Sequence, residues 1–98
     1  MAYKLQFMPA FDIDLSTAET YLSDYSPKAA KRLTSAVEKQ TLLLLSHPYM
    51  YPIYEVDPDF RIMPLPYQYL CFYIVNTDTE VIEVHHLFRS MQRIHDLL

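Results

Sequence analysis

The chain has 98 residues, and domains most often contain about 100–150 residues, so its length excludes two folded domains. A hydrophobic fraction of 51% argues against intrinsic disorder. Eight basic residues against twelve acidic ones give a net charge of −4, which argues against a general nucleic-acid coat. Glycine is absent. This excludes the dinucleotide-binding G-x-G-x-x-G motif, the Walker A loop and the G-x-S-x-G elbow of many hydrolases.

The single cysteine, Cys71, excludes an internal disulfide and a multi-cysteine zinc site. It lies in the apolar run 69–75, which is typical of a small buried side chain. We see no signal peptide and no apolar stretch near the ~20 residues that a membrane span needs. We therefore expect a soluble cytoplasmic protein that uses no membrane, metal or cofactor.

The first half of the sequence predicts a strand followed by two helices. Lys4–Met8 reads as a short strand closed by Pro9. Ser16 and Glu19 have the spacing of a capping box and predict that a first helix begins at Ser16 and extends to about Tyr25. Ser26-Pro27 is typical of an N-cap and first helical position, so a second helix is predicted from Pro27 to about Ser46.

The second half changes from helical to strand periodicity. Three strands are predicted, at Phe60–Met63, Tyr69–Val75 and Val81–Leu87. The turn 76–79 contains Asn76 and Asp78, the residues expected to adopt positive φ in the absence of glycine. A terminal helix is predicted for residues 90–98. The fold class is therefore α+β, one domain over residues 1–98, with a helical hairpin packed on one face of a mainly antiparallel sheet.

The order and spacing of these segments resemble the RelE/ParE superfamily of type II toxin–antitoxin toxins, which includes plasmid stabilisation proteins. The resemblance covers nearly the whole chain, and the stretch that joins the two helices, YLSDYSPKAAKRL at 21–33, is its clearest local part. The other matching segments are YKLQFMPA at 3–10, FR at 60–61, YQYLCFYIV at 67–75, VIEV at 81–84 and LF at 87–88.

The resemblance implies a small toxin that is neutralised by a partner antitoxin. The expected assemblies are a homodimer of the toxin or a heterotetramer of toxin and antitoxin. RelE-like members cleave ribosome-bound mRNA without a metal, whereas ParE-like members inhibit DNA gyrase. Of these activities, mRNA cleavage is slightly favoured. Gyrase inhibition without enzymatic activity is the alternative, and a non-toxic module that only binds the antitoxin is the third interpretation.

Metal-independent RNA cleavage requires a base, an acid and cations that stabilise the charged phosphorane. Arg61, His86 and Arg89 are the predicted catalytic residues, and Arg93 and His85 the predicted substrate-binding residues. His85 and His86 are adjacent on a strand and should point to opposite faces, with His86 on the open one. Because their side chains would point apart, we do not expect His85 and His86 to bind a metal together with His95. Each of these side chains has a structural interpretation as well, as a salt-bridged arginine or an ordinary strand histidine.

The distribution of charge weakens the prediction of an RNA-binding cleft. Residues 1–25 contain one basic and four acidic side chains. Residues 47–60 contain no basic and three acidic side chains. Residues 61–98 contain three basic and four acidic side chains. Only the second predicted helix is positive, with four basic residues and one acidic residue. A solvated helix face is the ordinary interpretation of such a pattern, so any phosphate site on the sheet would be small and local.

Overall fold

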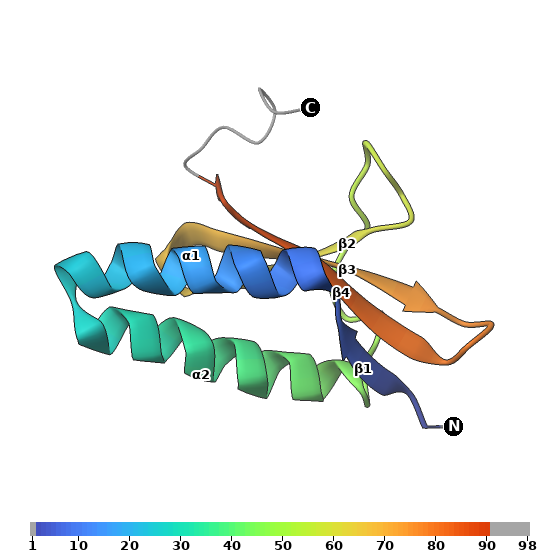
Figure 1. Cartoon of the computed structure of the whole chain (residues 1–98). Helices are drawn as coiled ribbons and strands as arrows, with labels where there is room; N and C mark the ends of the chain where they lie inside the picture. Colours follow the sequence, from blue (N-terminus) through green and yellow to red (C-terminus); the bar gives the residue numbers. More distant parts are fainter. Residues whose placement is uncertain (1, 91–98) are drawn as a thin grey trace.

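The computed structural model describes residues 2–90, in one sheet and a pair of long helices (Figure 1). The predicted terminal helix therefore lies outside the described residues, apart from Ser90. The elements in chain order are β1 (Lys4–Phe7), α1 (Pro9–Tyr25), α2 (Pro27–Leu44), β2 (Arg61–Leu65), the 3₁₀ turn η1 (Pro66–Gln68), β3 (Tyr69–Asn76) and β4 (Val81–Arg89).

The four strands form one mixed sheet in the order β1-β4-β3-β2. β1 is parallel to β4, while β4, β3 and β2 form an antiparallel meander. The parallel pairing is possible because the helical hairpin connects β1 to the rest of the chain and returns it to the sheet. The predicted α+β class, element order and helical hairpin are confirmed.

The first helix begins earlier than the sequence predicted. α1 starts at Pro9, with Met8 in extended conformation as its N-cap. Pro9 is the first helical residue, where a missing N–H is of little consequence, so it both ends the strand and opens the helix. Ser16 lies exposed in the middle of α1. The predicted capping box at Ser16 and Glu19 is therefore wrong.

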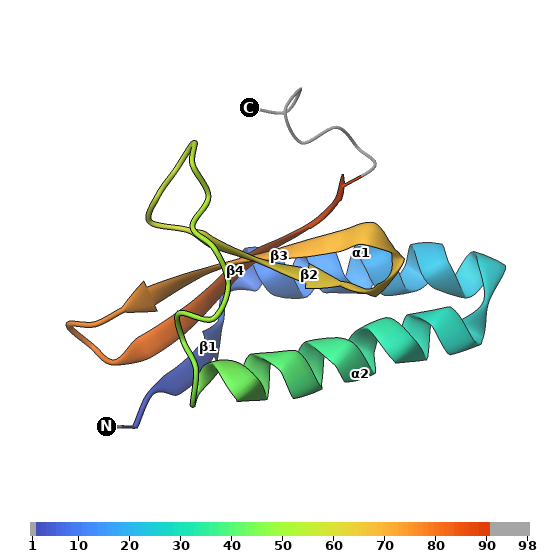
Figure 2. The same ribbon diagram turned by 180° about the vertical axis from the view of Figure 1, so that it is seen from behind.

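The second helix follows the prediction closely. The Ser26 side chain accepts a hydrogen bond from the Ala29 N–H at 3.3 Å, as expected of an N-cap. α2 ends at Leu44, two residues before the predicted end. Figures 1 and 2 show α1 and α2 side by side along most of their length. Only Ser26 separates them, which makes the hairpin tight.

The core lies between the hairpin and one face of the sheet, which we call the covered face. Leu33 of α2, Tyr73 of β3 and Val84 of β4 are fully buried there. Tyr73 also donates a hydrogen bond from its hydroxyl to the Pro48 carbonyl at 3.0 Å. Burial raises the pKa of Tyr73 to about 12 and that of Cys71 to about 12. Cys71 is therefore a buried thiol, as the sequence predicted.

The other face of the sheet, which we call the open face, has no helix on it. The long connection 47–60 begins beside the end of α2, and its later part projects from the open side of the sheet in both Figures 1 and 2. Its residues also cover the edge of β2, because the Ile62 N–H donates to the Pro52 carbonyl and the Tyr54 N–H to the Phe60 carbonyl. Pro64 lies further along β2, at the edge of the sheet, where a missing donor is tolerated.

Residues other than glycine occupy the left-handed backbone positions. They are Tyr67 and Gln68 before β3, and Glu80 before β4, with φ of 62°, 65° and 57°. The prediction that Asn76 and Asp78 would adopt positive φ is wrong. Asn76 acts through its side chain instead, because its Oδ1 accepts from the N–H groups of Asp78 and Thr79 and closes the turn.

Within residues 2–90, neither helix is long and apolar enough to cross a membrane.

Candidate functional site

Both histidines of β4 lie on the open face, because the strand contains a β-bulge. Phe72 pairs with His86 and Tyr73 with Val84, so His85 is an extra residue in β4 at this point. A bulge places two residues opposite one and changes the alternation of side chains. The expectation that His85 and His86 point to opposite faces is therefore wrong.

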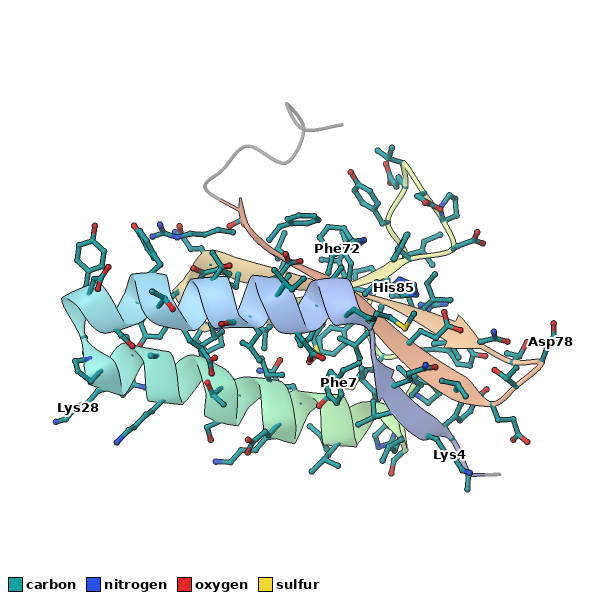
Figure 3. The ribbon with its side chains drawn as sticks, viewed as in Figure 1. Lys4, Phe7, Lys28, Phe72, Asp78 and His85 are labelled. Atoms are coloured by element: carbon teal, nitrogen blue, oxygen red, sulfur yellow. The ribbon has the colours of Figure 1, made fainter. Side chains whose placement is uncertain are left out.

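Aromatic side chains surround the two histidines and form an aromatic–histidine cluster. Its members, from β3, β4 and the 47–60 connection, are Tyr54, Phe60, Phe72, His85, His86 and Phe88. Phe60 packs edge-on against His85, with 5.4 Å between ring centroids, and His86 stacks on Phe88 at 5.5 Å. Figure 3 shows Phe72 and His85 on the side of the sheet away from α2. Only 4% of Phe72 is exposed, so the cluster is a small second core.

Each histidine lies near a carboxylate. His85 Nε2 is 2.9 Å from Glu83 Oε1, and His86 Nδ1 is 3.8 Å from Asp14 Oδ2. The hydrogen bond with His85, and a second one from Asn76, hold the pKa of Glu83 below its usual value. These pairs are half-buried and position the rings. Each contact is an ion pair only when its histidine is protonated.

Asp14 of α1 also closes the free edge of β4. β1 pairs with β4 only as far as Val84, so the backbone beyond it has no strand neighbour on that side. The carboxylate of Asp14 accepts from the Leu87 N–H at 3.0 Å. The sequence offered no signal for this role, since Asp14 is one of several acidic residues along α1.

Arg61 lies on the covered face, at the start of β2. It pairs with Tyr73, whose side chain is in the core, and its Nη1 donates to the Tyr51 carbonyl at 2.7 Å. Its guanidinium stacks over the Tyr49 ring at 4.9 Å. Both contacts connect Arg61 to the 47–60 connection, so in this structure the side chain fastens that segment to the sheet.

Arg89 also lies on the covered-face side, at the other end of the sheet. It pairs with Tyr69, stacks over the Tyr21 ring of α1 at 4.8 Å and donates to the Tyr21 hydroxyl at 2.7 Å. This hydrogen bond is the main reason why the pKa of Tyr21 is lowered. Arg89 lines a cavity of about 270 Å³ with Thr17, Asp14 and Phe88 among its neighbours.

The structure does not bring the predicted catalytic residues together. Arg61 and Arg89 lie on the covered-face side, four residue pairs apart along β3, whereas His86 lies on the open face. His85 and His86 do lie together. Arg93, and His95 beyond it, lie outside the described residues. Within residues 2–90, no three side chains of His, Cys, Asp or Glu gather in a way that could hold a metal ion.

The open face is mainly apolar around the aromatic–histidine cluster, whereas Lys4, Gln6 and Glu83 lie at its other end. Ile62, Pro64 and Leu70 join the aromatic–histidine cluster there, as the strand registers require. Among strand residues on this face, Lys4 at the far edge is the one lysine or arginine in the described part of the chain. The sequence located the strands and placed His86 on this face, as the structure does, but it did not place His85 there, because the bulge adds one residue to β4 at that point.

Comparison with known proteins identifies the family. Residues 5–93 match the family described as "ParE toxin of type II toxin-antitoxin system, parDE". The chain belongs to the ParE toxin family. A solved structure titled "Chromosomal ParDE TA system from P. aeruginosa" has the same fold, with a TM-score of 0.73 at 15% sequence identity. The alignment covers 90% of this chain and 96% of that chain. No curated protein matches.

Membership in the ParE family confirms the predicted superfamily and makes this chain the toxin component of a type II toxin–antitoxin system. It also implies a cognate antitoxin as partner. The target is a separate question, because related toxins on this fold act on different targets.

Proposed function

We propose that this ParE toxin inhibits DNA gyrase by binding it, without enzymatic activity of its own. The observation that carries the proposal is the separation of the basic side chains from the open face. Cleavage of a phosphodiester needs a cation beside the acid and base to stabilise the transition state. Here Arg61 and Arg89 are held by Tyr49, Tyr51 and Tyr21 on the covered-face side.

The chemistry of the open face supports a protein target. Affinity for RNA comes largely from contacts of lysine and arginine with phosphates. Ile62, Leu70 and Phe88 are half-buried on this face, and apolar side chains of this kind form the centre of protein–protein interfaces. Members of the ParE family are also commonly gyrase inhibitors.

One observation favours mRNA cleavage as a second candidate. The bulge places His85 and His86 on one face, with 6.1 Å between ring centroids, and each has a carboxylate neighbour. Two neighbouring imidazoles can act as base and acid on the two sides of one phosphate. The role of Arg61, His86 and Arg89 as catalytic residues, with Arg93 and His85 binding substrate, belongs to this candidate.

Induced expression in a bacterial host, with separate readouts for DNA damage and translation, tests the proposal. We expect an SOS response and covalent gyrase–DNA complexes while mRNA remains intact. Transcripts cut at the ribosomal A site, without DNA damage, would instead support the second candidate. Harmless expression of folded protein would indicate a module that only binds its antitoxin.

A surface variant sharpens this test. Leu70→Asp places a charge on the open face, and we expect it to abolish the DNA damage response. Ile13→Asp introduces the same charge on α1, where 67% of Ile13 is exposed, and should leave the response unchanged. Equal toxicity of both folded variants would contradict a role for the open face in binding the target.

A further inference from the structure

A cavity of about 270 Å³ lies between α1 and the end of β4, beyond the point where β1 stops. Asp14, Ala18 and Tyr21 line it from α1, where spacings of four and three residues place them on one face of the helix. Leu87 and Arg89 line it from β4. Ala18 and Leu87 are buried, so the floor of the cavity is apolar.

One end of the cavity presents hydrogen-bond acceptors. The side chain of Asp14 is 27% exposed, and its Oδ2 accepts from the Leu87 N–H at 3.0 Å. Within residues 2–90, its other oxygen, Oδ1, has no hydrogen-bond partner. The N–H and C=O of one strand residue point to the same side, so the Leu87 carbonyl also faces this edge. A carboxylate and a carbonyl are acceptors suited to an ammonium group, which has three donors.

The other end of the cavity presents donors. Arg89 Nη1 donates to the Tyr21 hydroxyl at 2.7 Å, and the guanidinium carbon lies 4.8 Å from the centroid of the Tyr21 ring. This stacking orients the guanidinium, whose fork of N–H donors matches the geometry of a carboxylate. Tyr21 is 39% exposed, so a ligand can reach this end from solvent.

The distance between the two ends suits a small zwitterion. Asp14 and Tyr21 are seven residues apart on α1, which corresponds to about 10 Å at ~1.5 Å per residue. A hydrogen bond of about 2.9 Å at each end leaves roughly 4 Å between them. This suits an α-amino acid, in which one carbon atom separates the ammonium from the carboxylate. Pockets for larger ligands measure about 300–1,000 Å³, so the volume of about 270 Å³ also favours a ligand of this size.

We propose that this cavity binds a free α-amino acid with an apolar side chain. The ammonium group donates to Asp14 and the Leu87 carbonyl, and the carboxylate accepts from Arg89. The apolar side chain lies against Ala18 on the floor of the cavity. Asp14 disfavours a phosphate or an RNA as the ligand, because its carboxylate repels a second anion. The cavity lies away from the apolar part of the open face, and the proposal does not depend on the target of the toxin.

Isothermal titration calorimetry of the full-length chain with L-leucine, L-methionine and L-phenylalanine tests the proposal. We expect at least one of them to bind with a dissociation constant of about 0.1–1 mM, because so small a ligand makes few contacts. The N-acetyl derivative of that amino acid lacks the ammonium group and the amide derivative lacks the carboxylate, so each should bind about tenfold more weakly or worse. Glycine should also bind about tenfold more weakly, because it has no apolar side chain to bury.

Variants of the two ends sharpen the test. Asp14→Asn keeps an acceptor for the Leu87 N–H but removes the charge, so the protein should fold and bind the amino acid about tenfold more weakly. Arg89→Gln should weaken binding to a similar extent. Asp12→Asn and Lys4→Gln make the same changes of charge at exposed positions outside the cavity, and should alter the affinity by less than about threefold. Circular dichroism and thermal melting show whether each variant folds.

Three outcomes would overturn the proposal. The first is no heat of binding from any of the three amino acids at about 10 mM. The second is equal affinity for an amino acid and its N-acetyl derivative, or equal affinity of the wild type and folded Asp14→Asn. The third is binding of inorganic phosphate that Arg89→Gln loses and Asp14→Asn retains, which would identify a simple anion site.

Discussion

The two faces of the sheet use their polar side chains in different ways. On the covered face, Arg61 is held by the Tyr51 carbonyl and the Tyr49 ring, and Arg89 by the ring and hydroxyl of Tyr21; both join the sheet to its neighbours. On the open face, two histidines lie within an aromatic cluster, and each is near a carboxylate. Residues close in the sequence therefore belong to different environments. A set of functional residues has to be assembled from the register of the strands and not from their order along the chain.

The largest expected effects compare a residue of the main core with one of the aromatic–histidine cluster. Leu33→Ala leaves a cavity under the hairpin, and Phe72→Ala removes the ring against which Tyr54, Phe60 and Phe88 pack. We expect each to lower the free energy of unfolding by about 3 kcal/mol in urea denaturation. A loss under about 1 kcal/mol for Phe72→Ala would mean that the open face has no second core.

The next effect concerns the edge of β4. Asp14→Ala removes the acceptor of the Leu87 N–H and should destabilise the protein by about 1–2 kcal/mol. Asp14→Asn keeps an acceptor and should recover most of that loss. Asp12→Ala, at an exposed position in the first turn of the same helix, should cost under about 0.5 kcal/mol. Equal melting temperatures for Asp14→Ala and Asp12→Ala would refute the edge-closing role.

A smaller effect is expected for Arg61. Arg61→Ala loses the hydrogen bond to Tyr51 and the stacking on Tyr49, and should reduce the free energy of unfolding by about 1 kcal/mol. Because these contacts fasten the 47–60 connection, limited proteolysis should cut that segment faster in the variant. Since Arg61 lies away from the open face, folded Arg61→Ala should still inhibit gyrase. Loss of inhibition without loss of stability would place Arg61 in the functional site.

The smallest effect depends on pH. The pKa of Glu83 is lowered by hydrogen bonds from His85 and Asn76, so ionised Glu83 stabilises the fold at pH values above its unfolded pKa of about 4.3. That contribution is lost as the pH falls through the lower folded pKa. Glu83→Gln should therefore reduce the change in thermal stability between pH 5 and pH 3, by a few tenths of a kcal/mol. Identical pH profiles would contradict the pairing.

Much of the fold could be predicted from the sequence because its signals are local. The Ser26-Pro27 start of α2 and the β-rich run in β3 are decided by neighbouring residues, and both were predicted correctly. The start of α1 was not, because Ser16 and Glu19 match a capping box equally well inside a helix that begins at Pro9.

The candidate site could not be predicted because it depends on contacts between distant residues. The bulge at His85 depends on how β4 pairs with Phe72 and Tyr73 of β3, and the sequence of β4 alone does not predict it. The positive φ of Glu80 is likewise a consequence of how the turn joins two paired strands. Tyr21 and Arg89 are 68 residues apart in the chain, and no local sequence pattern connects them.

The most direct test of a gyrase-directed toxin is a supercoiling assay with purified gyrase, relaxed plasmid and the purified full-length chain. A parallel reaction with translating ribosomes and a labelled mRNA measures cleavage. Because the basic residues are separated from the open face, we expect the gyrase reaction to lose supercoiling activity and to yield linear DNA after protein digestion. We expect the mRNA in the ribosome reaction to remain intact. Undisturbed supercoiling together with mRNA cut at the ribosomal A site would contradict it.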